Sequence, residues 1–523
     1  MRGAALALTP LLLVGCVLAV RAQPTAWPTP LARSTPAPLP TQVWSGAPAS
    51  SFTLTVEPLG VSPDGSARAV VRADLRDASD APTRLRRGGD FDFSVDRGSV
   101  QWQTRLRYRG PAAVVAVRDA VAVTIRAHAN EPAGLGSAHA RFDARAIAPT
   151  VVAGAIGPHL VRVGWFPRVR RGVVRVYRVD ERGIRASVPT AVVRAPASSW
   201  DDGTVRPGAV ARYLVALPGG THAAHALVPP ELPRTDAQAV RGTATWLAFS
   251  GDPLDDERYA ALDVAQIVDV AVRAHLRAVE LRLAYGAFDE TTPDAKPTVD
   301  ALIDGLVTHG VRVIGWTVPR TLDADDLTEA CAVAAYRTPA GNGISGLAVD
   351  LERGPEFLGT GASGYAALRD YLAVLRRAVG PHVLLLATVE DPYLDRLTAA
   401  TFPYPAIARA ADVLQPMVYW HAFGGGDPAR ARRAVAGSLR ALRALAPGVP
   451  VDVGLQTAPL GPHGAPSPAE LAAALSAAHA GGALGVAFYD WSGTAPAQWE
   501  VLARDAARGS GSGPGVRPVE RQP

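Results

Sequence analysis

The fold of this chain can be inferred from the stretch Gly346-Leu347-Ala348-Val349-Asp350-Leu351-Glu352. Its pattern predicts a short apolar strand that ends in two acids. Side chains alternate along a strand, so Asp350 and Glu352 point to the same side, with Ala348 below them on that face. Two carboxylates at the end of an apolar strand are costly to bury unless they meet partners or water. The open end of a parallel barrel supplies both, so we expect these acids at the centre of an active site in a (β/α)8 barrel.

The sequence on both sides of this stretch alternates between strand and helix patterns. Apolar runs typical of strands fall at 244–249, 278–285, 311–318, 346–352, 383–389, 413–420, 451–457 and 485–491. Helical periodicity lies between most of them and is weakest after the fifth strand, around 404–411. Eight strand–helix pairs in about 265 residues match the usual size of a (β/α)8 barrel. We therefore predict a TIM barrel over residues 241–508.

The chain of 523 residues is too long for one compact domain, and the part before the barrel has all-β patterns. Residues 49–148 and 149–232 contain short alternating runs separated by turns, which predicts two β-sandwich modules. The run 121–127, with the turn residues after it, resembles the immunoglobulin-like modules of invasin-type surface proteins. The second module, with Trp165 early and Tyr213 late, resembles a fibronectin type III domain. We expect Trp165 and Tyr213 to pack in its core rather than to contact a ligand.

The first 22 residues are typical of an export signal, because Arg2 precedes a mostly apolar run. Cleavage after Ala22 would release an ordinary secreted protein. The segment 13–16 instead resembles a bacterial lipobox, which would place a lipid on Cys16 and anchor the protein to the membrane. An uncleaved anchor is the third option. We therefore expect an exported protein, secreted or held at the cell envelope, with a Pro-rich linker at 23–48 and a disordered tail at 509–523.

Composition and motifs exclude several classes of function. The net charge of +5 is small for 523 residues and the arginines are scattered, so we expect no nucleic-acid-binding surface. No His or Cys cluster has metal-ligand spacing, and the glycines at 424–426 lack the lysine of a phosphate loop, so we expect no metal and no cofactor. Cys331 is the only cysteine beyond residue 22 and no histidine stands in a paired motif with it. We therefore expect neither a disulfide nor a thiol nucleophile.

Functional residues of such a barrel sit at the C-terminal ends of its strands. The sequence places acids, amides and aromatic residues there. This set suits a sugar, because aromatic faces stack on pyranose rings while carboxylates and amides bind the hydroxyl groups. The candidate substrate-binding residues are Trp316, Gln415, Trp420, His421, Gln456, Asp490, Trp491 and Glu390. Glu280 and Arg282, which alternate on the second strand, are interpreted instead as a structural ion pair or as part of an outer face.

Two close carboxylates also suit the cleavage of a glycosidic bond. One of them must stay protonated to donate to the leaving oxygen, and a neighbouring negative charge raises its pKa. Glu352, nearer the mouth, is the candidate acid, and Asp350 beneath it would orient it or exchange a proton with it. Glu390 or Asp490 could supply the second carboxylate of a conventional pair. The sequence leaves open the sugar, the linkage, and retention or inversion at the anomeric carbon.

The strand ends resemble those of the chitinase-like glycoside hydrolases of family 18. The similar segments are Asp350-Leu351-Glu352, Gln415-Pro416-Met417-Val418-Tyr419 and Trp491. The resemblance implies that Glu352 is the acid and that Asp350 helps the acetamido group of the substrate to act as nucleophile. It further implies that Tyr419 assists, that Trp491 forms the floor of the sugar site, and that the substrate is a polymer of N-acetylated glucosamine.

The sequence also departs from that family, which keeps other functions open. The first two signature acids fall at Ser345 and Ala348, and Trp420 follows Tyr419 where the family usually has Asp or Asn. Lysozymes of the family 25 type also present an acid pair on a barrel strand, so a peptidoglycan muramidase is one alternative. A non-catalytic carbohydrate-binding or cell-envelope scaffold is a second alternative, and a barrel hydrolase for another bond is a third.

Overall fold

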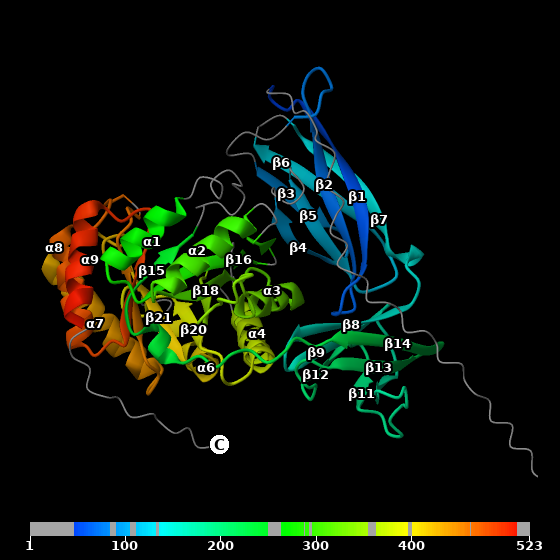
Figure 1. Ribbon diagram of the computed structural model, residues 1–523. Helices are drawn as coiled ribbons and strands as arrows, with labels where there is room; N and C mark the ends of the chain where they lie inside the picture. The colour runs from blue at the N-terminus through cyan, green and yellow to red at the C-terminus, as the bar shows by residue number, and fades with distance from the viewer. Residues whose placement is uncertain are drawn as a thin grey trace, which may run out of the picture.

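The computed structural model describes residues 47–83, 90–104, 111–131, 135–248, 263–286, 288–291, 295–353, 362–395, 400–460 and 462–509. The predictions for the export signal, Cys16, Ala22, most of the linker and nearly all of the tail lie outside these residues. In the part of the chain that is described, no helix has the length and hydropathy needed to cross a bilayer. A C-terminal barrel follows two all-β modules (Figure 1).

The C-terminal part of the described chain contains a closed barrel of eight parallel strands. In chain order these are β15 (Gly242–Leu247), β16 (Ala278–Tyr285), β18 (Arg312–Val318), β19 (Leu347–Leu351), β20 (Leu385–Val389), β21 (Val413–Val418), β22 (Asp452–Gln456) and β23 (Gly485–Tyr489). Each strand pairs with the next, and β15 pairs with both β16 and β23, which closes the ring. The two-residue strand β17 (Phe288–Asp289) adds an antiparallel extension to β16. The predicted (β/α)8 barrel is confirmed.

Helices cover the outside of the barrel. They are α1 (Val264–Arg273), α2 (Lys296–Thr308), α3 (Ala324–Ala334), α4 (Ala362–Val379), α6 (Tyr404–Ala410), α7 (Pro428–Leu445), α8 (Pro468–Ala480) and α9 (Pro496–Gly509). Their first turns carry ordinary capping residues: Asp323 and Asp427 accept hydrogen bonds from free backbone N–H groups of α3 and α7, and Ser467 and Glu470 form a capping box on α8. The weak helical pattern after the fifth strand corresponds to the short helix α6.

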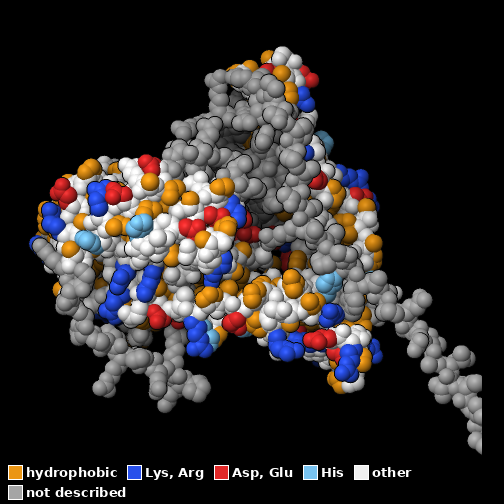
Figure 2. Space-filling view, viewed as in Figure 1, with side chains coloured by type: hydrophobic (Ala, Val, Ile, Leu, Met, Phe, Trp, Pro, Cys, Tyr) orange, Lys and Arg blue, Asp and Glu red, His pale blue; other side chains and the backbone are white. Residues whose placement is uncertain are grey.

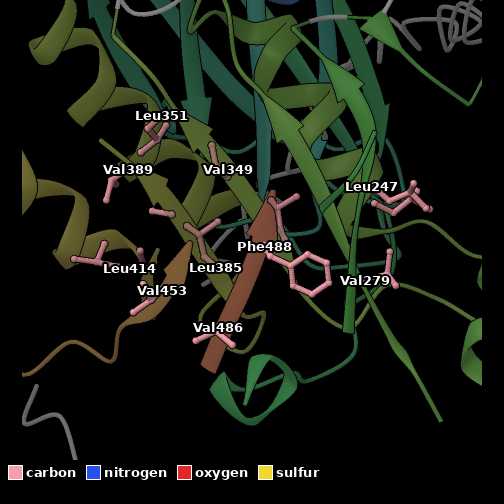
Figure 3. Close-up of a cluster of buried hydrophobic side chains, with 14 of the residues drawn as sticks. Leu247, Val279, Val349, Leu351, Leu385, Val389, Leu414, Val453, Val486 and Phe488 are labelled. Atoms are coloured by element: carbon pink, nitrogen blue, oxygen red, sulfur yellow. The ribbon is translucent and has the colours of Figure 1, made fainter. Parts of the chain in front are cut away.

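The barrel strands separate two hydrophobic cores. One face of each strand packs against the helices and forms the outer core, which includes Leu347, Val349 and Leu351 of β19 and is shown in part in Figure 3. The other face, which includes Ala348, fills the barrel interior together with the short 3-10 helix η2 (Ala237–Val240). Asp350 lies two residues beyond Ala348, so strand alternation turns its side chain to the interior, as the sequence predicts.

Each all-β module consists of two antiparallel sheets. In the first module the sheet orders are β1-β2-β5-β4 and β3-β6-β7, which is the order of constant-type immunoglobulin domains. Its strands are β1 (Ser51–Val61), β2 (Ala67–Arg76), β3 (Asp90–Val95), β4 (Ser99–Thr104), β5 (Ala112–Val117), β6 (Ala122–Glu131) and β7 (Ser137–Asp143). A shared core that includes Phe52 of one sheet and Phe91 of the other joins them. The predicted first sandwich is therefore confirmed.

The second module has the sheet orders β11-β10-β13-β14 and β12-β9-β8. Its strands are β8 (Thr150–Gly157), β9 (Leu160–Phe166), β10 (Val173–Val179), β11 (Ala191–Arg194), β12 (Ser199–Asp202), β13 (Val210–Leu217) and β14 (Gly220–Leu227). Trp165 and Tyr213 are fully buried in its core, as expected. Membership of the immunoglobulin-like and fibronectin type III families stays a prediction, as do the domain boundaries.

Both modules pack against the side of the barrel. Strand β8 lies beside α3 and α4 (Figure 1). The contact is close enough that a Cβ added to Gly157 would lie 2.6 Å from the carbonyl oxygen of Ala378 in α4. Arg68 of the first module forms an ion pair with Asp325 in the first turn of α3. The three parts of the described chain are therefore in direct contact.

Candidate active site

The acid pair lies at the C-terminal end of β19, the fourth strand of the barrel. Asp350 is buried, and Glu352, just past the strand, is half-buried. Burial raises the pKa of Asp350 well above its ordinary value, and the nearby charge of Glu352 raises it further. Among the described residues, Oδ1 of Asp350 has no hydrogen-bond partner. The structure thus brings the two predicted acids together, one above the other at the barrel mouth.

Aromatic residues from three strands stand beside this pair. The ring of Tyr419 lies 5.9 Å from that of Tyr489, and the ring of Tyr489 lies 6.0 Å from that of Trp246. Tyr419 and Tyr489 are half-buried, whereas Trp246 is almost fully buried beneath them. Burial raises the pKa of Tyr419 well above its ordinary value, and Tyr489 and Asp350 contribute to the increase. Tyr419 therefore lies where the sequence predicts it, near the acids.

Tyr489 and Trp246 were not among the predicted site residues. Tyr489 is two residues beyond Ala487, which faces the barrel interior, so alternation along β23 could have identified it. The predicted floor, Trp491, lies beyond the end of the strand. It packs against Trp499 of α9 with a ring separation of 4.9 Å and is partly buried in the outer core. Tyr419 and Tyr489 are half-buried aromatic side chains that lie near the acids.

A second pair of carboxyl groups lies deeper in the barrel. Nε2 of Gln415 donates to Oε1 of Glu280 and to Oδ2 of Asp452, both at 2.7 Å, and Oε1 of Gln415 accepts from Thr388 at 2.7 Å. Burial raises the pKa of Asp452 to about 7. Burial and the charge of Asp452 also raise the pKa of Glu280 well above its ordinary value. Gln415 is fully buried, and these interior contacts occupy its amide.

Of the two interpretations of Glu280 and Arg282, the outer face is wrong, and the ion pair holds only for Arg282, whose partner is Glu290. Both side chains are buried inside the barrel, where their alternation on β16 places them on the interior face. Arg282 donates to Glu290 at 2.7 Å rather than to Glu280, and its guanidinium lies 5.5 Å from the ring centres of Trp316 and Tyr285. Trp316 is a buried part of the interior wall near Asp350.

Three predicted binding residues lie in structural networks away from the acid pair. Trp420 is fully buried in the outer core, and its indole donates to Glu470 of α8 at 3.3 Å. His421 uses both ring nitrogens, with Glu470 at 2.9 Å and the carbonyl oxygen of His463 at 2.9 Å. The side-chain amide of Gln456 is fully buried, accepts from the backbone N–H of Ala422 and donates to the carbonyl of Ala458.

The two candidate second carboxylates differ in their surroundings. Glu390 is half-buried and accepts from the backbone N–H of Arg353 at 3.1 Å. Burial raises its pKa, and its charge contributes to the raised pKa of Asp350, so it lies near the acid pair. Asp490 instead closes a local turn, in which its oxygens accept from Ser492 at 2.6 Å and from the N–H of Gly493 at 2.9 Å.

The described residues contain neither a metal-binding group nor a reactive thiol. No group of three or more His, Cys, Asp or Glu side chains there is placed to hold a metal ion. Cys331 is buried in α3, and burial raises the pKa of its thiol to about 12. A thiol with so high a pKa is a poor nucleophile at neutral pH.

Comparison with known proteins gives matches only among solved structures. No protein-family model and no curated protein matches the chain. A chitinase from Chromobacterium violaceum ATCC 12472 is 15% identical over 51% of this chain and 99% of that chain, with a TM-score of 0.37. The spore cortex-lytic enzyme SleL of Bacillus cereus is 10% identical over 53% and 76%, with a TM-score of 0.36. A family 18 N-acetylglucosaminidase from Paenibacillus barengoltzii is 13% identical over 51% and 99%, with a TM-score of 0.35.

Proposed function

We propose that the protein is an exported glycoside hydrolase that cleaves O-glycosidic bonds in a cell-wall or extracellular polysaccharide. The observation that carries the proposal is the position of Asp350: a buried acid with a raised pKa, close enough to Glu352 to feel its charge, at the C-terminal end of a barrel strand. Of the structural partners described, none is a cation that would hold Asp350 in its ionised form. Such an environment favours the protonated form of an acid, which can then transfer its proton.

In this proposal Glu352 donates a proton to the leaving oxygen. Its half-buried position just beyond the strand puts it nearer to the mouth than Asp350. Asp350 below it orients Glu352 and exchanges a proton with it. The hydroxyl of Tyr419, which lies beside the acids, donates a hydrogen bond that stabilises the reacting sugar.

The aromatic residues support a sugar as substrate. Tyr419 and Tyr489 present half-buried rings beside the acids, and aromatic rings stack against the apolar face of a pyranose. A polymer that contains N-acetylated glucosamine is the favoured substrate because of the resemblance at 350–352 and 415–419. Peptidoglycan and chitin both contain this sugar, and the choice between them is part of the test.

A catalytically silent carbohydrate-binding protein is the second candidate. It is favoured by the burial of Trp420 and the packing of Trp491 against Trp499, which leave fewer aromatic surfaces for a sugar than the sequence suggests. Such a protein would bind a glycan and release no reducing ends.

The deciding experiment measures reducing-sugar release from chitin oligomers and from peptidoglycan by the protein without its export signal. The Glu352→Gln variant should lose at least about 10²-fold in turnover with an unchanged melting temperature. Glu500→Gln, the same change at an exposed position on α9, is the matched control and should retain full activity. Equal turnover by all three proteins would remove Glu352 from the mechanism. Binding without release by the wild type would favour the silent candidate.

A further inference from the structure

The second β-module carries an open cavity of about 750 Å³, far from the acid pair in the sequence and fold. It lies where the turn after β10 meets the loop between β12 and β13. A volume between about 300 and 1,000 Å³ holds a small ligand or a few units of a polymer. Its lining comes from the turn after β10, the loop between β12 and β13, and the start of β13.

The lining has a positive balance, with five arginines against two acids among the described residues. One acid, Asp180, is committed to the turn, because its Oδ1 accepts from the backbone N–H groups of Arg182 and Ile184 at 2.9 and 2.8 Å. Asp202, behind the lining, holds Arg178 through two hydrogen bonds of 2.7 and 2.6 Å. The positive charge that remains comes from side chains on different segments around one opening.

Three of these arginines are well placed to meet a ligand. Arg182 and Arg206 are exposed and Arg212 is half-buried on β13, so they approach the cavity from three segments. Arg185 stands over the ring of Tyr177 with 4.5 Å between the guanidinium carbon and the ring centre, which limits its freedom. Guanidinium groups bind carboxylates and phosphates through paired N–H donors, so this set selects for anionic groups.

Apolar side chains border the same opening. Ile184 is 61% and Val210 41% exposed, and both line the cavity. Figure 2 shows basic, acidic and apolar side chains together at the lower right, where the second module lies. Apolar contacts beside arginines suit the carbon skeleton of a sugar chain as well as its acidic groups. A ligand that is only a point charge would leave them unused.

We propose that this cavity binds an acidic polysaccharide, a sugar polymer that carries carboxylate or phosphate groups. The site is separate from the barrel mouth and does not depend on the proposed hydrolase activity. Its role is to hold the chain on an anionic glycan surface. The second β-module is then a binding module.

The test measures binding of defined polymers to the chain without its export signal, by calorimetry at low and at physiological salt. Polygalacturonate supplies carboxylates, phosphorylated dextran supplies phosphates, and unmodified dextran is the neutral control. At least one acidic polymer should bind, more weakly as salt rises, and dextran should not. The comparison of the two acidic polymers tells carboxylate from phosphate.

Two matched triple variants locate the binding. The first triple variant carries Arg182→Ala, Arg206→Ala and Arg212→Ala. It should weaken binding by at least about tenfold, because it removes the guanidinium groups that would bind the anionic groups of the polymer. The control triple variant carries Arg432→Ala, Arg433→Ala and Arg440→Ala. It removes the same charge from the exposed face of α7 and should change binding less than about twofold. Equal loss in both triples would show non-specific attraction and overturn the proposal.

Further outcomes keep the proposal falsifiable. If the first triple variant fails to fold, Arg182→Glu with Arg206→Glu changes only two exposed positions and should abolish binding. No binding of either acidic polymer at low salt would overturn the proposal. Duplex DNA serves as a further probe. If it binds as tightly as the acidic polymers and the same variants lose that binding, the cavity binds polyanions in general and the polysaccharide proposal is overturned. None of these binding experiments measures reducing-sugar release. Their results therefore do not depend on whether the proposed hydrolase activity is found.

Discussion

Two buried aspartates, one in the barrel and one in the second β-module, have opposite electrostatic environments. Burial raises the pKa of Asp350, and the neighbouring Glu352 raises it further. Burial also acts on Asp202 to raise its pKa, but hydrogen bonds from Arg178, the N–H of Thr204 and Tyr213 lower it below the ordinary value. Both residues are buried acids, so burial alone does not distinguish a structural acid from a chemical one. What distinguishes the two is whether a cation and hydrogen-bond donors stand beside the carboxylate.

The same contrast appears in a second pair. Asp64 in the first module has a pKa of about 2: burial raises it, but Arg68 and the side chains of Ser62 and Ser66 outweigh that effect. For Asp452 in the barrel interior, burial raises the pKa and only the hydrogen bond from the Gln415 amide opposes it, so its pKa is about 7. The modules thus use their acids in the ionised state, and the barrel interior favours the protonated state. The predictions below test this division.

The largest expected effect comes from Asp350→Asn. The amide has the same shape but cannot exchange a proton with Glu352, so kcat should fall by about 10²–10⁴-fold. The melting temperature should stay unchanged or rise, since no buried carboxyl group remains at that position. The two measurements are turnover on the chitin oligomers or peptidoglycan that the wild type cleaves, and thermal unfolding by calorimetry. A variant that keeps kcat within about threefold would show that Asp350 is only structural.

The second prediction concerns pH. The pKa of Asp452 is about 7 in the folded protein and near 4 when unfolded. The folded state therefore holds a proton that the unfolded state releases, and this contribution to stability is present below about pH 4 and lost as the pH rises to about 7. The loss amounts to at most about 4 kcal/mol.

Asp452→Asn should remove that part of the pH dependence. The variant should gain stability relative to the wild type at pH 7.5, and the two should converge near pH 4. Urea unfolding of the barrel at pH 4.5, 6 and 7.5 measures the slopes. Parallel slopes for variant and wild type would place the titration elsewhere, with Glu280 as the first residue to examine because Gln415 joins it to Asp452.

In the β-module the same kind of change should act on stability and leave turnover unaffected. Asp202→Ala leaves the Arg178 guanidinium and the buried Tyr213 hydroxyl without the carboxylate that accepts from both. The free energy of unfolding of the module should fall by about 2–3 kcal/mol, a value reduced because Arg178 is partly exposed. Glu181→Gln, an exposed change in the same module, should leave its melting temperature unchanged. A loss of turnover in Asp202→Ala at full folding would contradict the division.

Strand alternation explains which parts of the site could be predicted from sequence. The period of two fixes Asp350 on the same face as Ala348, whatever the rest of the barrel does. Alternation also puts Trp420 on the face of Leu414 and Val418, which pack in the outer core, so its choice as a sugar-binding residue goes against this rule. The rule failed at Trp491, which lies beyond the end of β23.

Contacts between strands lie beyond the reach of a single sequence. The grouping of Glu280, Gln415 and Asp452 depends on how β16, β21 and β22 are aligned across the barrel, and these strands are over 30 residues apart in the chain. The apolar pattern of each strand is compatible with several alignments. Only the closed barrel shows that these three polar side chains meet, with the amide of Gln415 bonded to one oxygen of each carboxyl group.

The smallest expected effect tests whether the first module supports the barrel mouth. Arg68 of that module pairs with Asp325 in the first turn of α3. The next residue, Asp326, accepts through Oδ2 from the backbone N–H groups of residues 320–322 at 2.7–2.9 Å. That segment carries Arg320, which donates to Tyr285 at the end of β16. A short chain of contacts thus runs from the module to the mouth.

Arg68→Ala should leave the half-buried Asp325 without its cation and weaken this end of α3 by about 1–2 kcal/mol. Hydrogen exchange of the amides of residues 320–322 should become about tenfold faster, because local opening of that segment becomes easier. Arg118→Ala, which removes a more exposed arginine beside Asp64, is the control and should leave these amides unchanged. If both variants exchange as the wild type does, the module only lies beside the barrel. If only Arg68→Ala speeds exchange, a cation supplied from outside the barrel orders a loop at its mouth.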